Sequence, residues 1–111
     1  MRLKEIMISE VEDTRPSDSL KEAAMKMKNL NVGLIPVCDG ERLCGMLTDR
    51  DITVRSTAYG NNPAETPVEG AMTQEVVYAF EDQDEEYAAK LMEEKQIRRL
   101  IVLNRDKRLV L

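Results

Sequence analysis

Ala23-Ala24-Met25-Lys26-Met27 recurs 65 positions further along the chain as Ala88-Ala89-Lys90-Leu91-Met92. The same offset relates other parts of the sequence: Met7 and Met72, Glu10-Val11 and Glu75-Val76, Val32 and Ile97, Val37 and Val102. A register kept over so long a span indicates an internal repeat. We therefore expect the 111 residues to contain two versions of one supersecondary unit.

The first copy predicts a helix, a hairpin and a second helix. Ser19-Leu20-Lys21-Glu22 is a capping box that begins a helix. The apolar residues of this helix recur at helical spacing: Leu20, Ala23, Ala24, Met27 and Leu30. Short apolar stretches at 34–38 and 43–47 flank the turn Asp39-Gly40 and predict two paired strands. Thr48-Asp49-Arg50-Asp51 then caps the second helix.

The second copy follows the same plan with local differences. Asp84 is the expected N-cap, and residues 99–103 form an apolar strand. The expected apolar face of its helix comprises Tyr87, Ala88, Leu91 and Met92. Glu85 replaces Leu20, so this helix is expected to be less buried at its start.

The repeat divides the sequence into a first unit at 1–58, a linker at 59–69 and a second unit at 70–111. Gly60, Pro63 and Pro67 mark the linker. The second copy stops near the position that corresponds to Gly45, so we expect it to lack the counterpart of 46–51 and of the following helix.

Composition limits the classes of function. Apolar residues make up 42% and charged residues 33%, which is typical of a soluble globular protein. No apolar run approaches the ~20 residues of a membrane span, and the N-terminus does not resemble a signal peptide, so we expect a cytoplasmic protein that contacts no membrane. A net charge of −5 disfavours binding to nucleic acid. Histidine, the commonest general base and metal ligand, is absent, and we expect no enzymatic activity.

Cys38 and Cys44 flank the predicted turn. Without a secretory signal they are expected to be reduced thiols with a structural role and not a disulfide framework. Zinc would need further ligands, which the neighbouring sequence does not offer, so no metal site is predicted.

Several stretches resemble the CBS-domain family. Gly45-Met46-Leu47-Thr48-Asp49-Arg50-Asp51-Ile52 matches the family signature Gly-x-apolar-Thr/Ser-x-x-Asp, and Val32–Val37 also fits the family pattern. The second copy resembles another CBS domain through Ala71-Met72 and Gln96–Val102. The resemblance covers nearly the whole chain, and the arrangement is similar to that of stand-alone two-CBS proteins. It implies a mixed α+β fold in which tandem CBS domains are related by a pseudo-two-fold axis and small sheets pack against helices.

The resemblance also implies regulatory ligands that contain adenosine, bound in a cleft between the CBS units: AMP, ADP, ATP or S-adenosylmethionine. No required cofactor is implied. Asp51 matches the position that the family uses to accept hydrogen bonds from both ribose hydroxyls. Thr48 offers a hydroxyl beside a helix N-terminus, where backbone N–H groups favour phosphate.

Five further positions complete the expected binding site. Arg98 and Arg99 match the place where some family members bring basic side chains to the phosphate, and Arg50 is a weaker candidate. Adenine would lie against Val11 and Val32.

These residues also have structural interpretations, and the function has alternatives. Thr48 and Asp51 would cap a helix in any case, and Arg98-Arg99 would either face solvent or pair with the acidic stretch Glu81–Glu86. The alternative to a ligand sensor is a dimeric protein-interaction module that binds no nucleotide. A third hypothesis is a redox- or metal-responsive protein that uses Cys38 and Cys44. We expect a homodimer that acts on an unidentified effector protein.

Overall fold

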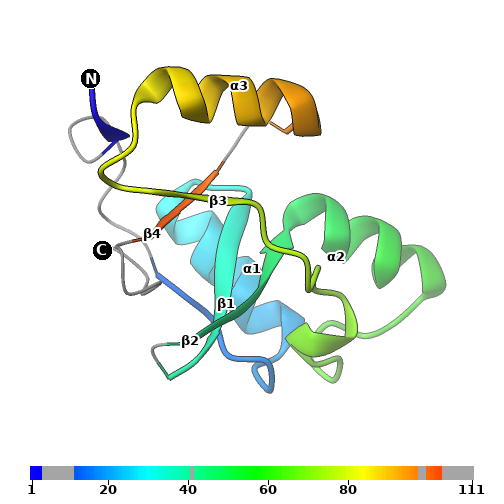
Figure 1. Ribbon diagram of the computed structural model, residues 1–111. Helices are drawn as coiled ribbons and strands as arrows, with labels where there is room; N and C mark the ends of the chain where they lie inside the picture. The colour runs from blue at the N-terminus through cyan, green and yellow to red at the C-terminus, as the bar shows by residue number, and fades with distance from the viewer. Residues whose placement is uncertain (4–11, 41, 98–99, 104–111) are drawn as a thin grey trace. The chain divides into compact units, whose positions relative to one another are not determined.

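The computed structural model describes residues 1–3, 12–40, 42–97 and 100–103. The elements, in chain order, are α1 (Leu20–Leu30), β1 (Leu34–Asp39), β2 (Arg42–Thr48), α2 (Asp49–Arg55), the 3-10 turns η2 (Thr57–Tyr59) and η3 (Val68–Gly70), β3 (Tyr78–Phe80), α3 (Glu85–Lys95) and β4 (Ile101–Leu103) (Figure 1). Helices combined with two small sheets give the α+β class that the sequence predicts. None of the helices in the described ranges is long and apolar enough to cross a bilayer.

The chain divides into two compact units. One unit spans Val11–Val76, and the other combines Met1–Glu10 with Val77–Leu111. We refer to them as the 11–76 unit and the 77–111 unit.

In the 11–76 unit, α1 begins and ends where its sequence predicts. Ser19 Oγ accepts the backbone N–H of Glu22 at 3.1 Å, which satisfies one of the unpaired donors of the first turn. Asn31 ends the helix in the left-handed conformation, at φ 54°, which is common at this position. The face that α1 buries contains Leu20, Ala23 and Met27.

Strands β1 and β2 form the predicted antiparallel hairpin, with Leu34 opposite Thr48 and Asp39 opposite Arg42. A bulge shifts the register between Val37 and Cys38. The hairpin and α1 enclose the core of this unit, to which η3 and the residue after it contribute Val68 and Ala71. The core residues are Leu20, Ala23, Met27, Ile35, Val37, Leu47, Val68 and Ala71.

The 77–111 unit has a smaller core that contains Leu3, Ala79 and Ala88. β4 pairs in parallel with β3, and Ala79 lies opposite Val102. The expected strand at 99–103 is thus present at Ile101–Leu103, whereas the sequence did not predict β3.

Helix α3 is less buried than α1, as the replacement of Leu20 by Glu85 predicts. Ala88 is the buried residue of α3, and Leu91 and Met92 are half-buried. The assignment of Tyr87 to the apolar face is wrong, since 48% of the residue is exposed. Tyr87 occupies the repeat position of Glu22, which is also exposed, because both side chains point away from the buried stripe.

The repeat is visible in the backbone hydrogen bonds. Two such bonds recur at the repeat offset, each 2.8 Å long: Val68 N–H to Asp18 O, and Leu3 N–H to Gln83 O. In the 77–111 unit, Leu3 at the start of the first copy therefore lies beside the helix start of the second copy, and in the 11–76 unit its repeat counterpart Val68, at the end of the predicted linker, lies beside the helix start of the first copy. The compact units are assembled from both copies, while the boundaries at 1–58, 59–69 and 70–111 remain a prediction about the sequence repeat.

Candidate functional site

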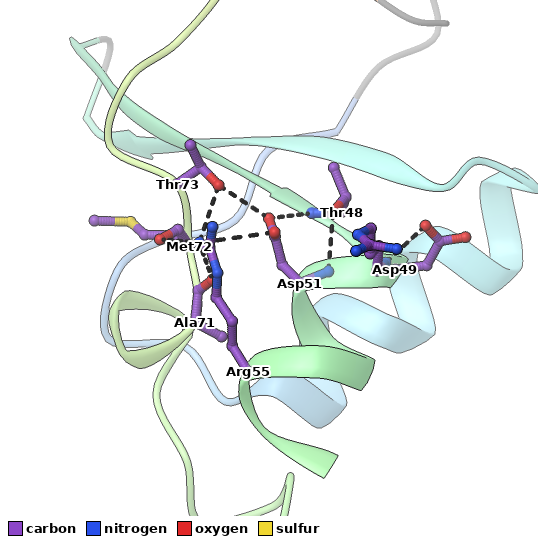
Figure 2. Close-up of polar contacts among 8 residues, drawn as sticks. Thr48, Asp49, Asp51, Arg55, Ala71, Met72 and Thr73 are labelled. Carbon is purple, nitrogen blue, oxygen red and sulfur yellow. Dashed lines mark hydrogen bonds and ion pairs between the residues drawn. The ribbon is translucent and has the colours of Figure 1, made fainter. Parts of the chain in front are cut away.

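Thr48 and Asp51 form reciprocal hydrogen bonds between side chain and backbone at the junction between β2 and α2 (Figure 2). Thr48 Oγ1 accepts the Asp51 N–H at 3.0 Å, and Asp51 Oδ2 accepts the Thr48 N–H at 3.1 Å. This is a capping box, which pairs donors that the first helical turn leaves without partners. The structural role that the sequence allows for these two residues is therefore present.

The Asp51 carboxylate has further neighbours besides Thr48. The hydroxyl of Thr73 donates to Oδ2 at 3.3 Å. Among the described residues, the cation near Oδ1 is Arg55 Nη1 at 3.7 Å, beyond hydrogen-bond length. Asp51 is 8% exposed. Oδ2 is thus committed to protein donors, while Oδ1 keeps lone pairs for another donor.

Arg55 extends this network to a segment outside α2. Its Nη1 donates to the carbonyl oxygens of Ala71 at 3.1 Å and Met72 at 3.2 Å, and to Thr73 Oγ1 at 3.0 Å (Figure 2). Sequence reasoning did not name Arg55 or Thr73. Arg55 lies one helical turn after Asp51, and this spacing is a signal for an ion pair that could have found it.

Residues 71–73 lie against the edge of β2. Thr73 and Met46 exchange both backbone hydrogen bonds, at 2.9 and 2.8 Å. A Cβ at Gly45 would lie 2.9 Å from Thr73 O and 3.0 Å from Met72 Sδ. The glycine of the family signature is therefore needed here because another backbone approaches it closely.

The other predicted binding residues are placed only in part. Arg50 is exposed on α2. Val32 is half-buried against the core of the 11–76 unit, and the hydrogen bond from Asp49 N–H to Gly33 O, 2.9 Å, ties the residue after it to the start of α2. Val11, Arg98 and Arg99 lie outside the described residues. The structure thus brings Thr48 and Asp51 together, with the loop that contains Val32 beside them.

The two cysteines are free thiols on β1 and β2. Burial, together with the nearby Asp13 carboxylate, raises the pKa of Cys38 to about 12. Burial also raises the pKa of Cys44, whose Sγ donates to Val37 O at 3.2 Å. Protonated thiols are poor nucleophiles and metal ligands, which favours the structural interpretation. Within the described ranges, no group of three His, Cys, Asp or Glu residues is placed to hold a metal ion.

The family model of the CBS domain matches residues 3–56 and 68–110. CBS domain-containing protein YhcV of Bacillus subtilis (strain 168) is 41% identical over 104 residues, which cover 94% of this chain and 74% of that protein.

The fold is also found in solved structures of other proteins. The crystal structure of Hypoxic Response Protein I with two coordinated zinc ions is 32% identical, with a TM-score of 0.87 over 99% of this chain and 89% of that chain. The CBS domain pair of protein MJ0100, in complex with 5′-methylthioadenosine and S-adenosyl-L-methionine, is 27% identical, with a TM-score of 0.84 over 99% of this chain and 89% of that chain. Because the family model matches both copies of the repeat and the fold agrees over the same length, the chain belongs to the CBS-domain family and carries two CBS domains in tandem.

Proposed function

We propose that this protein is a regulatory module, not an enzyme, that binds an adenosine-containing ligand through Asp51 and Thr48. The observation that carries the proposal is that the two oxygens of the Asp51 carboxylate have different partners. Oδ2 accepts from Thr48 and Thr73, whereas Oδ1 has Arg55 at 3.7 Å. An adenosine ribose carries two neighbouring hydroxyls, and Oδ1 has two lone pairs to accept them.

The chemistry of Thr48 complements that of Asp51. Its Oγ1 accepts the Asp51 N–H, so the hydroxyl proton can be donated to a ligand oxygen. The cap also fixes the rotamers of both side chains before any ligand arrives, which lowers the entropy lost on binding.

A solved relative supports this ligand class. The CBS domain pair of protein MJ0100, at 27% identity, is in complex with two adenosine derivatives. AMP, ADP, ATP and S-adenosylmethionine are therefore the ligands to test. In this proposal Arg98, Arg99 and Arg50 serve any phosphate, and Val11 and Val32 contact adenine.

The test is calorimetric titration with S-adenosylmethionine, AMP, ADP and ATP. Asp51→Asn keeps the size of the side chain but removes the charge, and we expect it to weaken binding at least tenfold, because hydrogen bonds to charged groups contribute about 1.5–3 kcal/mol. Ser19→Ala is the matched control, because it removes an N-cap of the same unit at a distance in sequence from Asp51. Equal affinity of wild type and Asp51→Asn would refute the assignment.

The capping box also favours a second candidate function. Thr48 and Asp51 already complete one another's hydrogen bonds, so the motif has a structural use without any ligand. On this alternative the protein is a dimeric interaction module for an effector protein. A homodimer by light scattering, with no heat from any of the four ligands, would favour it over the sensor.

In either form we propose a cytoplasmic homodimer. A monomeric mass at micromolar concentration would contradict this part of the proposal.

A further inference from the structure

Arg55, Thr73 and Asp51 form a closed ring of polar contacts within the 11–76 unit (Figure 2). Arg55 Nη1 donates to Thr73 Oγ1 at 3.0 Å, and the Thr73 hydroxyl donates to Asp51 Oδ2 at 3.3 Å. The ion pair of 3.7 Å between Arg55 and Asp51 Oδ1 closes the ring. One nitrogen thus contacts both the carboxylate and the segment 71–73.

Residues 71–73, which Arg55 of α2 contacts, lead to the rest of the chain. Thr73 pairs with Met46 on the edge of β2, and the 11–76 unit ends three residues later, at Val76. The backbone that Arg55 holds is therefore part of the covalent connection to the 77–111 unit.

We propose that Arg55 is a positioning residue that couples the state of the Asp51 carboxylate to the docking of residues 71–73 on β2. Nη1 carries two protons, which three hydrogen-bond acceptors in residues 71–73 share, and the Asp51 carboxylate attracts the same nitrogen from 3.7 Å. A group that occupies Oδ1 releases Arg55 from the carboxylate and strengthens its hydrogen bonds to Ala71, Met72 and Thr73. Where that group is a ligand hydroxyl, the inference rests on the proposed function; the coupling within the protein does not.

Amide hydrogen exchange in the full chain tests the coupling. Thr73 N–H reports docking on β2, and Cys38 N–H, which is bonded to Thr14 O at 2.9 Å, reports the stability of the whole unit. We expect Arg55→Gln to accelerate exchange at Thr73 about tenfold or more relative to Cys38. The matched control is Arg42→Gln, which removes the same charge from an exposed position on β2.

A double-mutant comparison of Thr73 exchange rates, made without ligand, decides the inference. Asp51→Asn should change the Thr73 rate in the wild-type background and have a much smaller effect in the Arg55→Gln background, as coupling requires. Equal effects in the two backgrounds, or acceleration at Cys38 as large as that at Thr73, would overturn the inference. Arg55→Lys keeps the charge with a single nitrogen and should give intermediate rates; it replaces Arg55→Gln if that variant does not fold.

Saturating S-adenosylmethionine separates this inference from the proposed function. We expect the ligand to slow Thr73 exchange in wild type and to bind Arg55→Gln without that slowing. Binding with equal slowing in both proteins overturns the role of Arg55 and leaves the proposed function intact. Absence of binding to wild type contradicts that ligand assignment, while the ligand-free double-mutant comparison still decides the coupling.

Discussion

Replacing Gly45 with alanine tests the close approach of residues 71–73 to β2. The added Cβ would lie 2.9 Å from Thr73 O, a backbone atom that cannot move without weakening its hydrogen bond to Met46. Overpacking costs about 1–3 kcal/mol, and each backbone hydrogen bond contributes about 0.5–1.5 kcal/mol. Alanine also stabilises the folded state by about 0.4–1 kcal/mol, because it lowers the conformational entropy of the unfolded chain. We expect a net loss of about 2 kcal/mol in the free energy of unfolding.

Urea unfolding followed by circular dichroism measures this loss, and exchange at Thr73 N–H shows where it arises. Gly70→Ala is the matched control, since its Cβ would meet Thr66 Cγ2 at an ordinary 3.8 Å. We expect this control to stay within about 0.5 kcal/mol of wild type. If Gly45→Ala is as stable as wild type and protects Thr73 equally, the argument from close approach is refuted.

Three further outcomes follow from buried or bonded side chains. Leu20 is fully buried, so Leu20→Ala should lower the free energy of unfolding by about 2–5 kcal/mol in the same urea assay. Cys38, with its pKa raised to about 12, should react with a disulfide reagent at pH 8 only as fast as the unit unfolds, and rapid labelling of the folded protein would contradict its burial. The Arg15 N–H and the Thr14 hydroxyl donate to the Asp18 carboxylate and lower its pKa below 3.8. The contribution of Asp18 to the free energy of unfolding is therefore present above the pKa of the unfolded state and is lost as the pH falls through the pKa of the folded state. Between pH 5 and pH 3, about one unit either side of an ordinary carboxyl pKa, the urea midpoint should therefore fall less in Asp18→Asn than in wild type.

The elements of the first copy were predictable because their signals are local. The Ser19 cap and the apolar spacing of α1 lie within one helix, and the strands of the hairpin flank a short turn that contains Gly40 at φ 65°. β3 escaped prediction because three residues carry little periodicity and their partner, β4, lies more than twenty positions away. The misplacement of Tyr87 was avoidable, since the repeat aligns it with Glu22 on an exposed face.

The candidate site divides in the same way. Thr48 and Asp51 lie three positions apart, and their capping box is visible in the sequence. Thr73 is 22 positions from Asp51 and reaches it only through the packing of residues 71–73 on β2. No local pattern specifies such a contact, and for that reason Thr73 emerged only from the structure, whereas the spacing of Arg55 one turn after Asp51 is a local signal that sequence reasoning did not use.

Leu3 pairs with the helix start of the second copy, and Val68 pairs with that of the first copy. This exchange has a consequence for how the protein folds and for where the chain can be cut. Val68 and Leu3 each complete a core whose helix belongs to the other sequence copy. One copy expressed by itself would lack the segment that its helix start requires, and it could obtain that segment only from a second molecule. Its folding would then depend on protein concentration, as in a domain-swapped dimer. A covalent link between the copies makes the exchange intramolecular and keeps the partner at a high effective concentration. Fragments cut between Gly60 and Pro63, before the segment that pairs with the start of α1, should accordingly regain structure only when they are mixed.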